Sequence, residues 1–171
     1  DLLSGKTVAI GSIENPQVIH GEDVMTRITF STVNKTHLEA LQKLVVDGVN
    51  KILYQTCAEG KVNPHSVYHV VVVGNTAMHH LFLGIEPKYI ALSPFTPAVK
   101  RQICATAREL KIETNPRGLI TFLPIIAGFV GADAIADLLA TGIFESDELS
   151  LLLDIGTNTE VFVGNKEDLV C

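Results

Sequence analysis

The residues best suited to chemistry lie near the end of the sequence, in the segment 151–163. An apolar run ends at Asp154, a polar turn follows, and a second apolar run resumes, which predicts strand, tight turn and strand. Gly156 has no Cβ, so a phosphate could approach the backbone N–H groups, and Asp154 could hold a hydrated Mg²⁺. The turn adds hydroxyl and amide donors from Thr157, Asn158 and Thr159. The segment predicts either a phosphate-binding hairpin or an ordinary hairpin with a polar turn.

A second segment, rich in small residues, precedes the hairpin. Residues 118–124 are strand-like, and residues 125–141 predict a helix closed by Gly142. Gly128 and Gly131 inside this helix each cost roughly 1 kcal/mol relative to alanine, so close approach of another backbone is expected there. The alternative is a tightly packed core helix.

A third segment combines a strand with a polar helix start. Val70–Val73 is an unbroken β-branched run, as expected of a strand buried on both faces of a parallel sheet. Asn75 or Thr76 then caps a short helix. Its N-terminus would face the carboxyl end of the strand, where open α/β sheets bind ligands.

Three sequence words carry a family resemblance: VVVGNTAMHHLFLGI, FLPIIAGFVGADAIADLLATG and LLLDIGTNTE. With Asn15-Pro-Gln and the segment 20–28, they resemble the ATPase region of the reductive activators of corrinoid proteins. The resemblance implies an α/β, ribonuclease-H-like lobe of the actin, sugar-kinase and heat-shock-chaperone type, with a mixed sheet flanked by helices. It also implies ATP and Mg as cofactors and a 2Fe–2S cluster outside this chain. The implied partner is a corrinoid protein or cobalamin-dependent methyltransferase, whose Co(II) is returned to Co(I).

The same resemblance assigns roles to particular residues. Asp154 would be catalytic and would hold Mg through water. The residues implied to contact ATP are Gly156, Thr157, Asn158, Thr159, Asn75 and Thr76, and those implied to form the hinge are Gly128, Gly131 and Asp133. Thr159 departs from the pattern because related hairpins often carry glycine there, so a phosphate would sit less deeply.

The resemblance also predicts a domain division. Residues 1–148 would form most of the first ATPase lobe, including the hinge helix 125–141, and residues 149–171 the opening phosphate hairpin of the second. The chain is then expected to be a fragment of an ATP-dependent activase, itself inactive and without bound cofactor. Two alternatives remain: a non-catalytic actin-like scaffold, or a kinase of the same superfamily.

Composition excludes several other classes of protein. The net charge of −6 and the scattered basic residues argue against nucleic acid, and no apolar run is long enough to span a membrane. The three cysteines are far apart, which predicts reduced thiols in a cytoplasm and no iron–sulfur cluster within this chain.

The remaining elements are predicted from local pattern. Thr36–Glu39 reads as a capping box that opens a helix reaching Leu53, and a shorter helix over 22–32 would place Asp23 and Arg27 as a surface pair. Thr7–Ile13 is predicted as an exposed edge strand that could pair two copies into a homodimer. Residues 84–97 hold three prolines and predict an exposed excursion, whereas 99–110 is ambiguous between strand and helix.

The histidines offer little support for a metal site. His65 and His69 stand four apart across a turn, and the adjacent His79 and His80 would point about 100° apart on a helix. Zinc is therefore not expected. His80 could instead cap or line the helix end near the nucleotide cleft.

Overall fold

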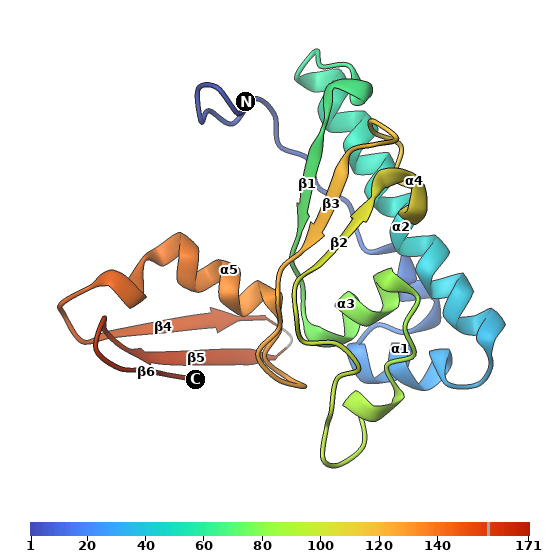
Figure 1. Cartoon of the computed structure of the whole chain (residues 1–171). Coiled ribbons are helices and arrows are strands. Elements are labelled where there is room, and N and C mark those ends of the chain that lie inside the picture. The colour runs from blue at the N-terminus through green and yellow to red at the C-terminus, as the bar shows by residue number, and fades with distance from the viewer. Residues whose placement is uncertain (157) are drawn as a thin grey trace.

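The structure is a computed structural model that describes residues 1–156 and 158–171, so the predicted phosphate ligand Thr157 lies outside the described residues. Two small sheets are visible, one backed by a long helix and the other beside a shorter one (Figure 1). The α-helices are α1 (Val24–Ser31), α2 (Lys35–Glu59), α3 (Thr76–Leu83), α4 (Ala107–Leu110) and α5 (Ala132–Thr141). The strands are β1 (His69–Val72), β2 (Ile103–Thr106), β3 (Leu119–Phe122), β4 (Ser150–Ile155), β5 (Thr159–Gly164) and β6 (Leu169–Val170). Short 3₁₀ turns occupy Pro16–His20, Pro64–Ser66, Lys88–Ile90 and Ile143–Glu145.

The first sheet is mixed and has the order β1-β3-β2. β1 pairs in parallel with β3 from His69 opposite Leu119 to Val72 opposite Phe122, and β2 pairs antiparallel with β3. The strands β1 and β3 were both predicted, and both are confirmed. The expectation that the valine run is buried on both faces was wrong, because Val71 and Val73 are exposed and β1 ends at Val72. The ambiguous segment 99–110 contains both structures, because β2 runs directly into α4 through the capping box of Thr106 and Glu109.

The core lies between this sheet and α2. The inward face of the sheet supplies Ile120 and Phe122, which are fully buried, and α2 packs against them with an apolar stripe. Phe82 of α3 meets the Phe122 ring edge-on at 5.1 Å between centroids. The buried members of this cluster are Val46, Phe82, Ala107, Ile112, Ile120 and Phe122. Burial of each such side chain contributes about 1.5–3 kcal/mol to the free energy of unfolding. This packing therefore stabilises the sheet that contains β1.

Two of the expected local contacts at helix starts were wrong. α2 begins one residue earlier than the predicted capping box, because the Asn34 side chain accepts the N–H of His37 at 2.9 Å. Arg27 is buried rather than a surface partner of Asp23, and its guanidinium donates to the carbonyls of Gly21 and Glu22. A guanidinium can be buried here because backbone oxygens meet its donors.

The second sheet is an antiparallel meander, β4-β5-β6. Asp154 pairs with Glu160 and Leu152 with Phe162, so these side chains share one face. Phe162 is fully buried, and α5 lies beside this sheet (Figure 1). The opposite face carries exposed apolar side chains from Leu151, Leu153, Ile155, Val161 and Val163.

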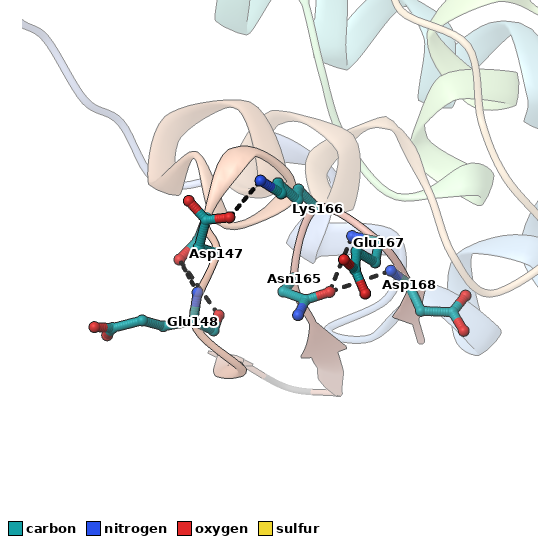
Figure 2. A network of polar contacts seen from close by, with 7 residues as sticks. Asp147, Glu148, Asn165, Lys166, Glu167 and Asp168 are labelled. Carbon is teal, nitrogen blue, oxygen red and sulfur yellow. Dashed lines mark hydrogen bonds and ion pairs between the residues drawn. The ribbon is translucent and has the colours of Figure 1, made fainter.

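Polar contacts join the loop before β4 to the turn between β5 and β6 (Figure 2). Lys166 forms an ion pair with Asp147, and its backbone N–H donates to the Ser146 carbonyl at 2.8 Å. The Asn165 side chain accepts the N–H groups of Glu167 and Asp168 at 2.9 and 3.2 Å. These contacts fix the hairpin at the end opposite to the β4–β5 turn. The β4–β5 turn itself is held by the pairing of the two strands.

The predicted N-terminal strand was wrong. Residues 6–15 have neither helical nor strand structure, and they run along the C-terminal half of α2. The contact is close, since a Cβ on Gly11 would stand 2.5 Å from Thr56 Oγ1. Without a strand at 7–13, the argument for a homodimer built on that edge is lost.

The excursion 84–97 is only partly exposed. Pro87, Ile90 and Pro97 are buried, whereas the residues between Ala91 and Pro97 reach the surface. Its chain is tied back by His80, whose Nε2 accepts the Ala98 N–H at 3.0 Å while Nδ1 donates to the Thr76 carbonyl at 2.7 Å. The buried His80 side chain therefore links α3 to the end of the excursion by hydrogen bonds.

Candidate functional site

The segment after β3 docks onto the loop that follows β1. The predicted helix 125–141 was wrong in its first part, because α5 begins only at Ala132 and Gly131 is its N-cap. The N–H groups of Ala132 and Asp133 point to the Gly74 carbonyl at 3.0 and 3.4 Å. A Cβ on Gly131 would stand 2.6 Å from the Asn75 Cα. The expected close backbone approach is real, although it occurs at a helix start.

Gly128 serves the same junction from an irregular loop. A Cβ there would stand 2.3 Å from the Phe95 carbonyl oxygen, so no other residue could approach the excursion so closely. The Phe95 and Phe129 rings pack beside this contact with centroids 5.1 Å apart. Of the three predicted hinge residues, two are therefore points of backbone contact, and the third, Asp133, lies in the first turn of α5.

Asn75 and Thr76, the predicted nucleotide contacts after β1, already have partners. The Asn75 side chain accepts the Met78 N–H at 2.9 Å and caps α3, as expected. Thr76 is buried, and its hydroxyl donates to the Ala127 carbonyl at 2.7 Å. Both side chains therefore shape the loop, and the residues left facing outward there present mainly backbone.

Carboxylates from α5 gather over the hairpin. Asp133 and Asp137 stand one turn apart on α5, and they face Asp154 and Glu160, which are cross-strand neighbours. These four residues are called the acidic cluster below. Asp137 Oδ2 is buried and has no hydrogen-bond partner. In the described part of the chain, no ion pair joins the cluster to a lysine or arginine.

Burial and mutual repulsion raise the pKa values of three carboxyl groups in the acidic cluster. Burial raises the pKa of Asp133, and the charge of Asp154 raises it further. The pKa of Asp137 rises for the same two reasons, and that of Glu160 rises through burial and the charges of Asp133 and Asp154. Like charges held together without a basic partner favour binding of a cation or a proton.

The hairpin turn is exposed and uses one of its own donors. The Gly156 N–H donates to the Asn158 carbonyl at 2.9 Å, and the nearest atom to a Cβ placed on Gly156 would be that oxygen, at 3.5 Å. Gly156 and Asn158 are both solvent-exposed. The structure thus places these residues at the surface beside the acidic cluster, within reach of a ligand from solution.

A cavity of about 570 Å³ lies against the hairpin turn. Asn158, Thr159 and Glu160 line it on one side, and Phe129 and Val130 from the loop before α5 line another. The start of α1 adds Asp23, whose side chain accepts the Thr26 N–H at 2.7 Å, and Cys171 also lines the cavity. A volume of this size falls in the range of small-molecule sites.

Several contributors to this site were missed from the sequence. Asp137 and Glu160 join Asp154 in the acidic cluster, and Phe129 lines the cavity. Helical spacing of Asp133 and Asp137 was a usable signal for one acidic face of a helix. Nothing local to Glu160 or Phe129 distinguishes them, since only the packing of α5 on the hairpin brings them into place.

Direct ligation of a metal ion by protein side chains requires several suitable residues close together. Within residues 1–156 and 158–171, no three His, Cys, Asp or Glu residues are arranged to hold a metal ion directly. Among these residues Cys57 is buried and Cys104 and Cys171 are exposed, all three as free thiols. The acidic cluster is therefore not a site with three direct protein ligands to a metal ion.

Known proteins resemble this chain closely. The model of the RACo middle region matches residues 1–146. The chain belongs to this family. The corrinoid activation enzyme RamQ of Eubacterium limosum is 34% identical over 165 residues, which are 96% of this chain and 28% of RamQ. A solved structure of a reductive activator for corrinoid, iron-sulfur protein matches with a TM-score of 0.95 and 42% identity, over 99% of this chain and 27% of that one.

The family match covers only part of the candidate site. Residues 1–146 include the Gly74 loop and α5, whereas the hairpin β4–β5 lies beyond the family match but inside the structural one. The chain spans little more than a quarter of the length of either relative. None of the helices in the described ranges is both long and apolar enough to cross a membrane.

Proposed function

We propose that this chain is part of an ATP-dependent reductive activator of a corrinoid protein. The observation that carries the proposal is the match to a solved reductive activator, at 42% identity and a TM-score of 0.95. A relative named as a corrinoid activation enzyme supports the same activity. The protein's partner would be a corrinoid protein or a cobalamin-dependent methyltransferase, and its action would help return Co(II) to Co(I). A 2Fe–2S cluster would be supplied from outside these residues.

Three segments that lie close together support the proposal that the protein binds ATP. The loop after β1 contacts the start of α5, and Asp133 of α5 faces Asp154 of the β4–β5 hairpin. In this proposal these three segments form the phosphate side of a ribonuclease-H-like ATPase lobe. In this proposal the exposed hairpin turn faces the phosphates, and Gly128 and Gly131 let the loops move as a hinge against their neighbours. Phosphoryl transfer requires mainly positioning of the reactants and neutralisation of charge.

The acidic cluster gives a reason for magnesium. Four carboxylates beside a phosphate would repel it, so anion binding there requires a divalent cation. The orphaned Asp137 Oδ2 and the raised pKa values of Asp133 and Asp137 fit such a need. Asp154 and Asp137 would orient the water shell of Mg²⁺, which supplies charge neutralisation when bound.

One observation favours the second candidate, a non-catalytic scaffold. The Gly156 N–H and the Thr76 hydroxyl both have protein partners, so neither is free to meet a phosphate without rearrangement. In that case the domain would still close on a partner, but nucleotide turnover would be lost.

The experiment compares the protein carrying Asp154→Asn with the wild type in the presence of its corrinoid partner. The absorbance of Co(II) cobalamin is followed after addition of Mg-ATP and a reductant. The variant is expected to fold normally and to lose about tenfold or more of the ATP-dependent rate, because charge at this position is needed only when nucleotide binds.

Asp168→Asn is the matched control, because Asp168 is an exposed carboxylate in the β5–β6 turn, outside the acidic cluster. It should keep the wild-type rate. Full ATP-dependent activation by Asp154→Asn would remove the assigned role. Activation by the wild type that needs no nucleotide would favour the scaffold.

A further inference from the structure

A second cavity, partly open to solvent beside Val73, lies away from the hairpin. It has a volume of about 170 Å³ and sits between α2, α3 and the end of β1. Its walls are apolar side chains, including Val45 and Val49 of α2, Phe82 of α3 and Phe122 of β3. Apolar walls of this kind favour an apolar ligand over water, because burying its surface removes apolar area from solvent.

One imidazole interrupts the apolar lining. His79 is only 4% exposed, it lines this cavity, and its Nε2 is buried without a hydrogen-bond partner. Its ring meets Phe122 edge-on, with centroids 5.2 Å apart. Burial lowers the pKa of His79 to about 4, and the neighbouring His80 contributes, so the ring is neutral at physiological pH.

An unpartnered nitrogen at this depth needs an explanation. Leaving a buried polar atom without a hydrogen bond is unfavourable, and most such atoms in folded proteins have a partner. Water is a poor candidate, because an ordered water requires two to four polar neighbours and His79 is the one lining side chain that carries nitrogen or oxygen. A ligand with an apolar body and one polar group meets both requirements.

We propose that this cavity is a binding site for a small, neutral aromatic molecule that carries one hydroxyl or N–H group. The ring fills the space between Val49, Phe82 and Phe122, and the polar group makes a hydrogen bond with His79 Nε2. The site adjoins Gly74, whose carbonyl accepts the N–H groups at the start of α5. A ligand in this cavity therefore stiffens the loop after β1, whose Gly74 carbonyl accepts the hydrogen bonds from the start of α5. The inference is independent of the proposed function.

The test uses two probes of the same shape, 4-fluorophenol and fluorobenzene, followed by fluorine NMR on the full chain. Both are expected to bind, and 4-fluorophenol should bind about fivefold more tightly because it alone can pair with His79. The Nε2 resonance of His79 should shift with 4-fluorophenol and stay in place with fluorobenzene. Amide signals of Ala132 and Asp133 should shift with both.

Variants separate the hydrogen bond from the space. His79→Phe should remove the preference for the hydroxyl, and Val49→Phe should fill the cavity and abolish binding of both probes. His65→Phe is the control, because His65 is exposed and lies outside this cavity, and it should change neither affinity.

Three results would overturn the proposal. These are no binding of either probe at about 10 mM, equal affinities of the two probes for the wild type, or an unchanged hydroxyl preference in His79→Phe. The His79 resonance is measured on the wild type, so the proposal remains falsifiable even if a variant does not fold.

Discussion

At the scale of single residues, glycine matters most where two backbones touch. A Cβ on Gly131 would overlap Asn75 and Gly74, whereas a Cβ on Gly156, in the exposed turn, would make only ordinary contact with the Asn158 carbonyl oxygen at 3.5 Å. The same type of residue therefore has two different reasons to be present. At Gly131 the packing of the fold excludes a larger side chain, and at Gly156 it does not.

This contrast can be measured with alanine. Gly131→Ala is expected to destabilise the chain by about 1–3 kcal/mol, because its Cβ would overlap the Asn75 Cα and the Gly74 carbonyl. Gly156→Ala should change the free energy of unfolding by less than about 0.5 kcal/mol. Urea denaturation of both variants tests the pair, and equal losses would show that the junction is looser than it appears.

The acidic cluster makes stability depend on pH. Burial and the charge of Asp154 raise the pKa of Asp137, so the folded state binds the proton more tightly than the unfolded state. The stabilising contribution is then present at low pH and is lost as pH rises through the raised pKa. At neutral pH the charged carboxylate destabilises the fold.

Asp137→Asn should therefore raise the melting temperature at pH 7 and have little effect near pH 4. The gain is expected to be about 1 °C, since solvent screens this partly exposed group. Calorimetry at the two pH values measures it, and Glu167→Gln, an exposed carboxylate outside the cluster, should have the same effect at both. A larger gain for Asp137→Asn at pH 4 than at pH 7 would contradict the electrostatic explanation.

At the scale of elements, helix starts are set by single polar side chains. α2 begins at Lys35 because Asn34 reaches the His37 N–H, while Thr36 lies exposed in the first turn. The expected box of Thr36 and Glu39 is bypassed. The cap stands two residues upstream of the predicted one, so the helix is two residues longer at its start and Asn34 accepts one of its free N–H groups.

Asn34→Ala is expected to cost about 1 kcal/mol, and Thr36→Ala close to nothing. Thermal unfolding followed by circular dichroism at 222 nm provides the comparison. If Thr36→Ala proved the more damaging of the two, the capping box would be the true start of α2.

At the scale of the whole molecule, the candidate site is open on one side. The chain contributes one hairpin, the loop after β1 and the start of α5. Among the described residues, four segments wall the cavity beside the hairpin: residues 23–25, 129–130, 158–161 and Cys171. Few contacts converge on any ligand there, and they must offset at least about 4 kcal/mol of association entropy.

The 171-residue chain is therefore expected to bind Mg-ATP no more tightly than about 1 mM. Isothermal titration calorimetry would decide. Micromolar binding would mean that residues within this chain form a complete nucleotide site, and a binding signal equal in Asp154→Asn would place it away from the acidic cluster.

Much of the architecture could be predicted from sequence. The valine run of β1, the strand β3, the Asn75 cap and the β4–β5 hairpin all depend on local spacing and on turn chemistry, and each was confirmed. The sequence words also predicted the corrinoid-activator family to which the chain is similar. These features depend on residues close together in the chain, because the conformational preferences and the hydrogen bonds that determine them are local.

Tertiary structure decided the rest. The first half of the predicted helix 125–141 is a loop, because Gly128 and Gly131 are drawn against Phe95 and Asn75. Glu160 and Asp137 join Asp154 only through the packing of α5 on the hairpin, and His79 lies unpaired only because three elements enclose it. Such features depend on contacts between residues distant in sequence, so their energies are absent from any local pattern.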